Sequence, residues 1–517
     1  MMPSKPCDLR ALLFALASLL LAAGCSPPEP VETAPAPTTA PDATVLRAAA
    51  EAHLTRDLVF EHLAWLASDE MRGRDTPSPE LELAAEYIAD HFRTVGVEPA
   101  GDGPDDYMQR WPFERLVFDA GASVASATGP DYSRELEYGT DFFAIPGSAT
   151  LMEGAPFYLA SPSQVGTGLP AEAAGRPVMV HLPDGLGPEF GMVVQAAMGA
   201  GASGVILLMD RDSDAADIFQ TAGALEAGAA GMIPFPVVGV RYEVGAEILA
   251  SAEVEPEGGR DPPAVLHDLS FEISTHFDST VDQVPNVVGI IRGSDPELAD
   301  SHIVLTAHFD HVGVGPPDAR GDSIFNGADD NASGTAVLMQ VAEALAALPE
   351  PPARSVLFLA VSGEEKGLLG SAYFANAPTI PAGSMVANLN MDMVSRNDPD
   401  TVFAIGEAYS TLGTTLEEIV ARHPELGLVA APDPVPEEEL FLRSDHFSFV
   451  EIGVPAMMFT TLLHDDYHLQ SDTPERTDPE KAARIGRLIF YLTHALANDP
   501  EVPEWTDEGR AVLDALP

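Results

Sequence analysis

Five short stretches of the chain combine histidine and acidic residues at spacings that suit metal binding or proton transfer. They are HFD (308–310), NGADDNASG (326–334), SGEE (362–365), NLNMDM (388–393) and YHLQSDT (467–473). In the second stretch, Asp329 and Asp330 stand side by side among residues too small to form a core. Carboxylates this close together repel one another unless a proton or a cation lies between them.

Apolar runs typical of buried β-strands precede four of the stretches, at 302–308, 355–361, 385–391 and 454–463. In open α/β sheets the carboxyl ends of neighbouring strands share one crevice, so groups far apart in sequence meet there. The stretch with the paired aspartates leads into a helical pattern, and we expect it at the same crevice. The side chains expected to gather there are His308, Asp330, Glu364, Glu365, Asp392 and His468.

Two imidazoles and four carboxylates cannot share a crevice as unpaired ions, and a bound cation resolves their repulsion. A mixture of imidazole and carboxylate without thiolate suits Zn²⁺, with Mn²⁺ or Co²⁺ as alternatives, whereas Ca²⁺ and Mg²⁺ favour oxygen ligands alone. Two histidines and three acids suffice for two metals when one acid bridges them, and metals about 3.5–4 Å apart are a known hydrolytic design.

In order and spacing, the five stretches resemble the co-catalytic zinc peptidases of clan MH, which include bacterial leucyl aminopeptidases and glutamate carboxypeptidase. The resemblance extends from His302 to His494. It implies an α/β fold with a mixed central sheet and helices on both faces. It also implies a cofactor of two Zn²⁺ ions per chain.

The same resemblance implies how the metal-binding side chains are shared. Asp330 would bridge both metals. His308 and Asp392 would complete one site, and Glu365 and His468 the other.

The resemblance further implies that Glu364 is the general base acting on a water activated by the two metals. Two neighbouring acids are expected to support this centre. Asp310 would orient the imidazole of His308, as metal-binding histidines usually require, and Asp329 would support the loop that carries Asp330.

By the same resemblance, the stretch RSDHFSF (443–449) lines the substrate pocket. Arg443, Asp445 and His446 are its candidates either for contacting the substrate or for supporting the metal ligands. Relatives often place a tyrosine at the position of Phe441, where its hydroxyl stabilises the tetrahedral oxyanion. Phe441 has no hydroxyl, so the metals, backbone donors or another residue would have to serve.

Two histidines near the five stretches, His311 and His464, have no place in these assignments. His446 shares their weakness as a signal, because a lone histidine rarely identifies a ligand by sequence alone. We therefore assign no role to His311 or His464 at this stage.

The elements that must position the site fall into several segments. Residues 46–115 are expected to form the N-terminal helical part of the peptidase domain, and 272–500 its catalytic part, followed by a tail at 501–517. Residues 116–271 contain short β-rich runs and resemble an inserted protease-associated domain. Within them GAGASG (199–204) matches a dinucleotide-binding pattern, but it precedes a strand instead of following one, which indicates a packing turn.

The N-terminal residues 1–25 have the features of a lipoprotein signal peptide. Basic Lys5 and Arg10 precede an apolar run that is too short to span a bilayer, and LLAAGCS resembles a lipobox that would make Cys25 the lipidated first residue. Residues 26–45, rich in Pro, Ala and Thr, are expected to form a tether. We expect an exported outer-membrane lipoprotein that faces the periplasm or the cell surface.

Composition narrows the possible partners. The 26 Lys and Arg residues against 80 Asp and Glu residues give a formal net charge of −54, which disfavours nucleic acid and anionic lipid. Membrane contact is therefore expected only through the lipid anchor. Cys7 and Cys25 are the two cysteines of the sequence, and since Cys7 lies in the removed segment, disulfides and thiolate zinc sites are excluded.

The favoured hypothesis is a zinc-dependent exopeptidase, and specifically an aminopeptidase that acts on peptides, because every expected ligand and the base are present. A carboxypeptidase or a glutaminyl cyclase-like enzyme on the same fold is the first alternative. Arg443, a cation near the site, keeps that alternative open, whereas an acid-rich crevice favours a free α-amine. A receptor-like binding protein without activity is the second alternative, against which the intact ligand set argues.

Overall fold

The computed structural model describes residues 43–119, 121–138, 140–144, 151–152, 156–160, 168–182, 188–209, 236–254, 264–315 and 317–516. The predicted signal peptide and all but the last three residues of the predicted tether lie outside the described residues. Helix α1 (Ala43–His53) begins within those last three residues. Among the described helices, none is both long enough and apolar enough to cross a bilayer.

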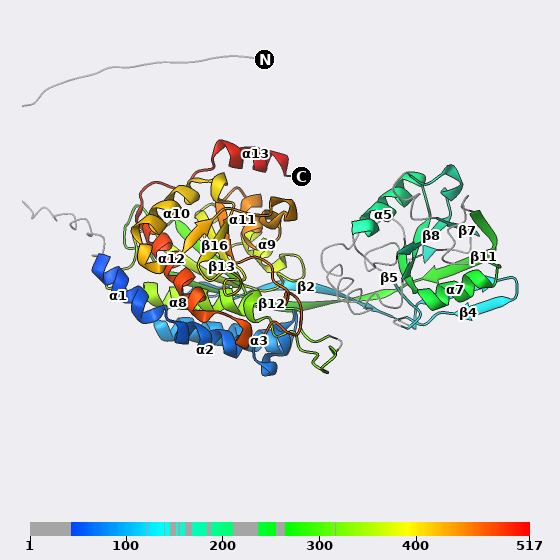
Figure 1. The fold of residues 1–517 in the computed structure, drawn as a ribbon, viewed down its shortest axis with the longest axis horizontal. Coiled ribbons are helices and arrows are strands. Elements are labelled where there is room, and N and C mark those ends of the chain that lie inside the picture. The colour runs from blue at the N-terminus through cyan, green and yellow to red at the C-terminus, as the bar shows by residue number, and fades with distance from the viewer. Residues whose placement is uncertain are drawn as a thin grey trace, which may run out of the picture. The chain divides into compact units, whose positions relative to one another are not determined.

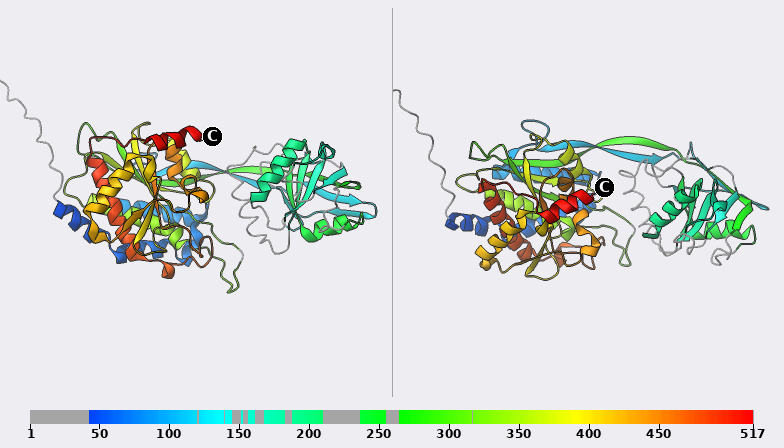
Figure 2. Two further views of the ribbon diagram at one scale, coloured as in Figure 1. Left: turned by 45° about the horizontal axis from the view of Figure 1, so that its top comes forward. Right: turned by 90° about the horizontal axis from the view of Figure 1, so that it is seen from above.

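The larger part of the chain is built on a mixed sheet whose strands follow the order β1-β12-β14-β13-β15-β18-β16-β17, with β2 paired to β12 (Figures 1 and 2). The bounds are β1 (Glu98–Pro99), β2 (Met108–Phe118), β12 (Phe277–Ile291), β13 (His302–His308), β14 (Ser355–Val361), β15 (Met385–Met391), β16 (Thr401–Ile405), β17 (Val429–Ala431) and β18 (Ala456–Thr460). Strands β14, β13, β15 and β18 run parallel to their neighbours in this central part of the sheet. The antiparallel strands β12 and β16 flank it.

The central strands are buried on both faces, which explains why their sequences are continuous apolar runs instead of alternating ones. Every residue of β13 and β14 is buried. On one face the strands contribute to a core with α1, α2, α3, α8, α10 and α12, and on the other they pack against α9 and α11. The predicted α/β fold, a mixed sheet with helices on both faces, is therefore confirmed.

The helices of this part are α1, α2 (Arg56–Leu66), α3 (Pro79–Val95), α8 (Gly334–Ala346), α9 (Leu369–Asn376), α10 (Thr411–Arg422), α11 (His446–Glu451), α12 (Pro479–Asn498) and α13 (Asp507–Ala515). Helix α3 shows how sequence fixes such an element. The Ser78 hydroxyl accepts a hydrogen bond from the Leu81 amide, Pro79 begins the helix, and Gly96 ends it in a left-handed conformation. Its apolar face, including Ile88 and Phe92, is buried in the core.

A second sheet with its own core lies within residues 124–274. Its order is β4-β3-β11-β7-β8-β9-β10-β5, with β6 paired to β11. The bounds of its elements are β3 (Val124–Gly129), β4 (Tyr132–Glu135), β5 (Phe142–Ala144), β6 (Leu151–Met152), β7 (Pro156–Leu159), β8 (Pro177–Leu182), α5 (Pro188–Ala200), β9 (Gly204–Met209), β10 (Val237–Arg241), α7 (Tyr242–Ala250) and β11 (Ala264–Ser274).

The predicted limits of the inserted segment, 116 and 271, fall inside β2 and β11. The strands that precede and follow the second sheet are β2 and β12, which pair with each other in antiparallel register from Met108–Val287 to Phe118–Phe277. The GAGASG stretch connects the end of α5 to the start of β9, with Gly201 in the left-handed region. Helix before strand is the order that the sequence indicated, and it is the reverse of a dinucleotide-binding turn.

Candidate metal centre and active site

The predicted metal-binding side chains meet at the carboxyl ends of four adjacent strands. His308 is the last residue of β13, Asp392 directly follows β15, and the two glutamates lie just after β14. His468 lies in the loop after β18, and Asp330 lies in the segment Ala328–Ser333 that leads into α8. The topology thus brings together residues separated by up to 160 positions, as expected for an open α/β sheet.

Asp330 faces two histidines through different oxygens. Its Oδ1 lies 3.3 Å from His308 Nε2, and its Oδ2 lies 3.1 Å from His468 Nε2. On one side Asp392 Oδ1 lies 3.5 Å from His308 Nε2. On the other, Glu365 Oε2 lies 3.0 Å from His468 Nε2. The carboxylate of Asp330 therefore lies between two groups of metal-binding side chains, one with His308 and Asp392 and the other with Glu365 and His468.

Small residues permit this approach of the Asp330 segment. A Cβ atom on Gly327 would lie 2.3 Å from the carbonyl oxygen of Asp330, and one on Gly334 would lie 2.3 Å from that of Met391. Gly327 also has a φ of +59°, which glycine adopts without steric cost. The glycines of NGADDNASG are thus required by close backbone packing around Asp330.

The donor set fits divalent zinc. Imidazoles and carboxylates are the ligands that Zn²⁺ accepts in the absence of thiolates. Two groups of side chains offer such atoms, and within each group these atoms lie within 4.8 Å of one another. The groups are His311, Asp330, Glu365 and His468, and His308, Glu364 and Asp392. Nε2 of His468 is buried and makes no hydrogen bond of good geometry among the described residues, although oxygens of Asp330 and Glu365 lie 3.1 and 3.0 Å from it. An atom that faces carboxylates in this way is suited to a metal ion placed between them.

Electrostatics at the centre show how strongly these groups are coupled. Burial lowers the pKa of His308, but Glu364 and Asp392 outweigh it and raise that pKa well above its ordinary value. Burial likewise opposes ionisation of Asp330, yet contact with His308 and His468 holds its pKa well below the usual range. The cluster thus favours ionised carboxylates beside positive charge, which is the charge pattern that a cation would meet.

The two adjacent glutamates have opposite environments. Burial, with repulsion from Glu365 and Asp392, raises the pKa of Glu364 well above its usual value. For Glu365, His468 and His311 overcome the effect of burial and lower the pKa to about 2. Carboxyls that differ in this way are suited to different tasks, one to carry a proton and the other to remain an anion.

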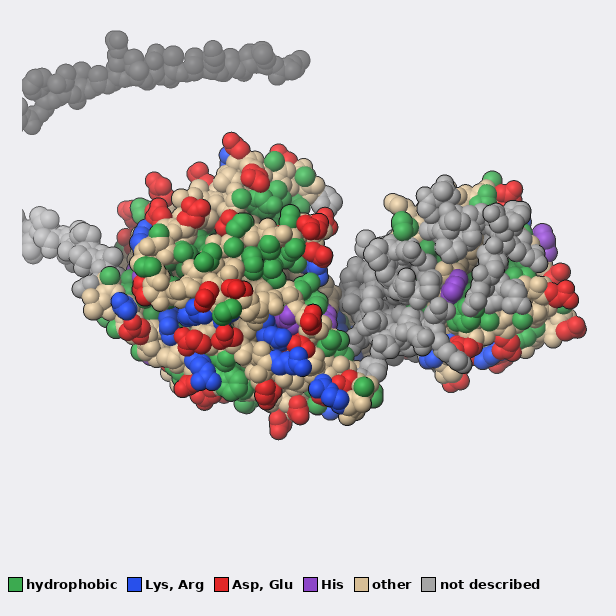
Figure 3. Space-filling model, viewed as in Figure 1, with side chains coloured by type: hydrophobic (Ala, Val, Ile, Leu, Met, Phe, Trp, Pro, Cys, Tyr) green, Lys and Arg blue, Asp and Glu red, His purple; other side chains and the backbone are tan. Residues whose placement is uncertain are grey.

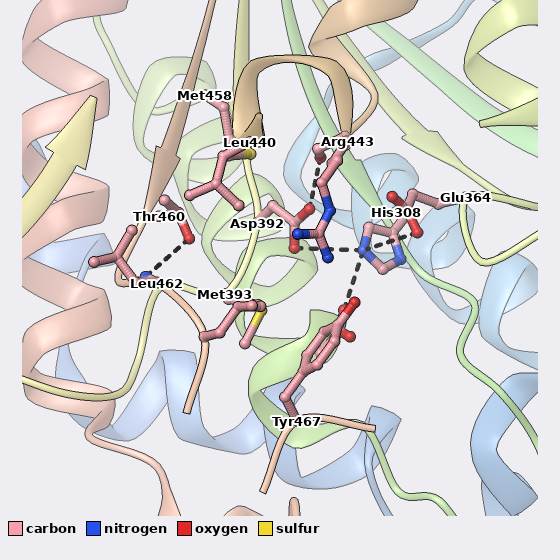
Figure 4. A pocket seen from close by; sticks show the side chains of 13 residues that line it. His308, Glu364, Asp392, Met393, Leu440, Arg443, Met458, Thr460, Leu462 and Tyr467 are labelled. Atoms are coloured by element: carbon pink, nitrogen blue, oxygen red, sulfur yellow. Dashed lines mark hydrogen bonds and ion pairs between the residues drawn. The ribbon is translucent and has the colours of Figure 1, made fainter. Parts of the chain in front are cut away.

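A cavity opens beside the metal-binding side chains of the His308 group (Figure 4). His308, Asp330, Glu364 and Asp392 form one part of its lining. The rest of its described lining is mostly apolar and consists of Met393, Leu440, Arg443, Ser444, Met458, Thr460, Leu462, Leu463 and Tyr467. The cavity can therefore hold an uncharged side chain close to groups that bind metal and move protons.

The two supporting acids lie where the sequence placed them, next to the loops of the centre. Asp310 Oδ2 accepts hydrogen bonds from the Thr76 hydroxyl at 2.9 Å and the Gly363 amide at 2.8 Å, and the carbonyl oxygen of Asp310 lies 3.3 Å from His308 Nδ1. Asp329 Oδ1 accepts from the amide of Ser395 at 2.7 Å. Asp329 therefore ties its loop to the segment after β15.

The residues of the stretch 443–449 take different positions around the cavity. Arg443 lines the cavity, but Asp445 and His446 are fully buried and are not among its described lining residues. Burial raises the pKa of Asp445 to about 7 and lowers that of His446 to about 3. Ser444, between Arg443 and Asp445, lines the cavity, and its hydroxyl donates to Asp392 Oδ2 at 2.6 Å.

Phe441, in turn, does not face the cavity. Its ring is buried and packs edge-on against Tyr409 and His446, with centroids 4.8 and 5.2 Å away. A hydroxyl enters the cavity from Tyr467 instead, whose phenol end points toward His308 in Figure 4. Tyr467 stacks on the imidazole of His468 at 3.9 Å. Its position next to His468 in YHLQSDT was the signal by which the sequence could have identified it.

Two histidines without an assigned role also lie at the centre. His311 Nδ1 lies 2.7 Å from Glu365 Oε1, and His464 Nε2 lies 3.3 Å from Asp329 Oδ2. Their spacing from the motifs gave no indication of these contacts, which depend on how the loops fold back.

Comparison with known proteins agrees with this geometry. Residues 286–493 match the family model described as peptidase family M28. A probable zinc metalloprotease of Leptosphaeria maculans is 27% identical over 277 residues, covering 45% of this chain and 62% of that protein. Aminopeptidase YwaD of Bacillus subtilis is 25% identical over 319 residues, covering 60% of each chain. This chain thus spans about three-fifths of the length of these curated relatives.

Among solved structures, an aminopeptidase from Aneurinibacillus sp. strain AM-1 superposes with a TM-score of 0.54 at 18% identity, covering 88% of this chain and 97% of that one. At this identity the similarity establishes a shared fold. The superposed region is longer than the part of the chain that forms either sheet alone, because it covers 88% of the chain. The similarity therefore extends beyond the sheet that carries the metal centre.

Proposed function

Because residues 286–493 match the model of peptidase family M28, we propose that this protein is a zinc-dependent exopeptidase, and specifically an aminopeptidase that removes N-terminal residues from peptides. The observation that carries the proposal is the position of Asp330 between two donor groups, one of which opens into a cavity together with Glu364. His308, Asp330 and Asp392 would hold one zinc ion, and Asp330, Glu365 and His468 the other.

Zinc held there would polarise the scissile carbonyl and acidify a water molecule. The residues of the chain supply the other steps. Glu364, next to the cavity, takes a proton from the attacking water and delivers it to the nitrogen of the leaving amine. The Tyr467 hydroxyl donates a hydrogen bond to the developing oxyanion, in place of the tyrosine expected at Phe441.

Ser444 keeps Asp392 in position. Its hydroxyl donates to Asp392 Oδ2 and itself accepts from the side-chain amide of Asn390 at 2.7 Å, and Asn390 accepts from Thr306 at 2.7 Å. This chain of hydrogen bonds fixes the orientation of a ligand before the substrate arrives.

The aminopeptidase assignment rests on the charges at the cavity. A free α-amine is stabilised by carboxylates, and Glu364 is the acid among the described lining residues of the cavity that is not assigned to a zinc ion. Arg443 is the only Lys or Arg among its described lining residues, and it favours the second candidate, a carboxypeptidase that would bind a terminal carboxylate. The Arg443 side chain is 41% exposed and lies 3.7 Å from the carboxylate of Glu438, which partly balances its positive charge.

A panel of amino-acid p-nitroanilides beside N-acetylated peptides tests the proposal. We expect cleavage of the former, no cleavage of the latter, and loss of activity in 1,10-phenanthroline that zinc restores. Arg443→Ala should leave anilide hydrolysis largely intact. If N-acetylated peptides were shortened from the C-terminus and Arg443→Ala stopped that reaction, the carboxypeptidase would be the correct assignment.

We also propose that the protein is exported and anchored through a lipid on Cys25. The support is the lipobox-like sequence LLAAGCS after a short apolar run. Cell fractionation of wild type and Cys25→Ser tests it. The wild type should sediment with membranes and incorporate radioactive palmitate, whereas Cys25→Ser should do neither, and label retained in Cys25→Ser would refute the anchor.

A further inference from the structure

His311 is a third imidazole at the centre, beyond the two that the sequence analysis assigned. It lies three residues after β13 and is fully buried. Its Nδ1 lies 2.7 Å from Glu365 Oε1 and 3.8 Å from Asp330 Oδ2, and its ring meets that of His468 edge-on at 5.5 Å.

The backbone holds this ring in place. A Cβ atom on Gly327 would lie 2.4 Å from His311 Cγ and 2.5 Å from its Cδ2, so the absence of a side chain at Gly327 makes the space that the imidazole occupies. The amide of His311 donates to the carbonyl oxygen of Arg74 at 3.4 Å. The ring is thus packed so that Nδ1 contacts the carboxylates of Glu365 and Asp330, while its buried Nε2 has no hydrogen-bond partner among the described residues.

The donors around this position match the size of a tetrahedral zinc site. Bonds of about 2.0–2.1 Å to nitrogen and oxygen place the ligands of tetrahedral zinc roughly 3.3 Å from one another. Here the separations are 2.7 Å between His311 and Glu365, 3.0 Å between His468 and Glu365, 3.1 Å between His468 and Asp330, and 3.8 Å between His311 and Asp330. Three of these separations are shorter and one is longer than the roughly 3.3 Å expected between the ligands of tetrahedral zinc.

The other donor group has a different character. His308, Asp330 and Asp392 line the cavity, whereas His311, Glu365 and His468 are not among its described lining residues. Zinc sites closed by four protein ligands serve structure, and sites with three protein ligands keep a position for water or substrate.

We propose that His311 binds zinc directly through Nδ1, so that one site is closed by four protein ligands, namely His311, Asp330, Glu365 and His468. The other site, formed by His308, Asp330 and Asp392, remains open toward the cavity. The first ion is then held tightly and the second exchanges more readily. This inference rests on the proposed zinc dependence and extends it to the inequality of the two ions.

The competing explanation is that His311 only donates a hydrogen bond to Glu365 and so orients it. Loss of such an orienting bond costs about 10–100-fold in metal affinity, and a glutamine can replace the donor. His311→Gln therefore separates the two explanations, and His302→Gln is a matched control, because His302 is a buried histidine at the opposite end of β13.

Zinc affinity is measured by competition with a chromogenic chelator in full-length protein. We expect His311→Gln to weaken the tighter ion by more than about 100-fold, beyond the cost of a lost orienting bond, and His302→Gln to bind both ions as the wild type does. Retention of the tighter ion at wild-type affinity in His311→Gln would overturn the proposal. Cooperative thermal unfolding of each variant, after a chelator has removed its metal, shows that the variant is folded.

A second variant tests coordination directly. In His311→Cys loaded with one equivalent of Co²⁺, a thiolate bound to the metal produces a sulfur-to-cobalt charge-transfer band in the near ultraviolet. The band should appear in the difference spectrum against the wild type, which carries the same other cysteines, and its absence would contradict ligation from position 311. Neither measurement needs a substrate, so a chain that bound zinc in this way but cleaved no peptide would refute the proposed function alone.

Discussion

Glu364 and Glu365 are adjacent in the sequence, yet their carboxyl groups have different partners. Glu364 lines the cavity and lies 4.0 Å from His308 Nε2, while Glu365 contacts the imidazoles of His311 and His468 at 2.7 and 3.0 Å. Glu364 can therefore face an attacking water, whereas the carboxylate of Glu365 is occupied by its contacts with the two imidazoles.

For Glu364→Gln we predict a fall in kcat of about 10²–10⁴-fold, the usual contribution of a general base, with zinc content unchanged. Glu365→Gln should instead lower zinc occupancy and regain part of its activity in excess zinc. Metal analysis and steady-state kinetics on both variants provide the comparison. If Glu364→Gln lost zinc and Glu365→Gln kept it, the two roles would be reversed.

Tyr467 and Phe441 form a second matched pair at the residue scale. Burial, with the nearby carboxylates of Asp330 and Glu365, raises the pKa of Tyr467 above its ordinary value, so its hydroxyl stays protonated and can donate a hydrogen bond. Tyr467→Phe should reduce kcat by about 10²–10³-fold, as for the loss of one oxyanion donor, with KM and zinc content retained. Phe441→Tyr should give no gain in kcat, because that ring lies in the core. A normal kcat in Tyr467→Phe would exclude this donor.

Among the elements, the loop that carries His468 is held by a buried carboxylate. Asp466 accepts hydrogen bonds from Arg396 at 2.6 Å, from Arg476 at 2.7 and 2.8 Å, and from the Ser471 hydroxyl at 2.6 Å. The side chain of Asp466 is only 6% exposed. These bonds tie the loop to the segment after β15 and to the segment before α12.

We predict that Asp466→Asn lowers the free energy of unfolding by about 1–3 kcal/mol, because charge-assisted bonds are lost and their donors remain. Zinc affinity should fall with it, since the loop positions His468. Chemical denaturation of metal-free protein and a zinc titration measure the two effects. Arg476→Met is the control, and it should cost under about 1 kcal/mol because the Arg476 side chain is half exposed. Unchanged zinc affinity in Asp466→Asn would show that the loop is held by other contacts.

The helices α2, α3 and α8 meet around a histidine that should make stability depend on pH. His62 Nδ1 lies 2.7 Å from the Tyr87 hydroxyl, and the Gln340 amide donates to His62 Nε2 at 2.9 Å, which is the pattern of a neutral imidazole. Burial, reinforced by the neighbouring His91, lowers the pKa of His62 to about 3.

Because this folded pKa lies below the unfolded value of about 6.5, the unfolded chain binds the proton more readily in between. The contribution of His62 is therefore complete above pH 6.5 and is lost as the pH falls toward 3. The Tm of metal-free protein should fall over the upper part of this range, and less steeply in His62→Gln. His276→Gln, at a side chain that is 58% exposed, should keep the wild-type slope. Equal slopes in all three proteins would contradict the assignment.

For the whole molecule, charge is the dominant property. The formal net charge is −54, and Asp and Glu side chains are dispersed over the face shown in Figure 3. Like charges at this density repel one another and destabilise the compact state.

Salt shortens the range of this repulsion, to about 3 Å at 1 M ionic strength. We therefore predict that Tm rises as NaCl is raised from 0.01 M to about 1 M at neutral pH. The rise should be smaller near pH 4, where carboxyl groups with pKa values of about 3.9–4.3 are partly protonated. A Tm that fell with salt at neutral pH would mean that surface ion pairs outweigh the repulsion.

The sequence by itself determined the fold class and the group of donors. Continuous apolar runs marked strands buried on both faces, and parallel strands place their carboxyl ends together, so His308, Asp392 and Glu365 could be grouped without coordinates. Glycines around Asp330 indicated a close approach of the backbone, which Gly327 and Gly334 now explain.

Only the tertiary structure decided which loop side chains face the centre. His311 and Tyr467 lie in it, while Asp445 and His446 are buried and are not among the described lining residues of the cavity, although all four are close in sequence to a motif. Strand periodicity fixes where a residue lies along the sheet, but a loop has no period. The direction of its side chains depends on contacts with distant segments, such as the space over Gly327 that accommodates the His311 ring.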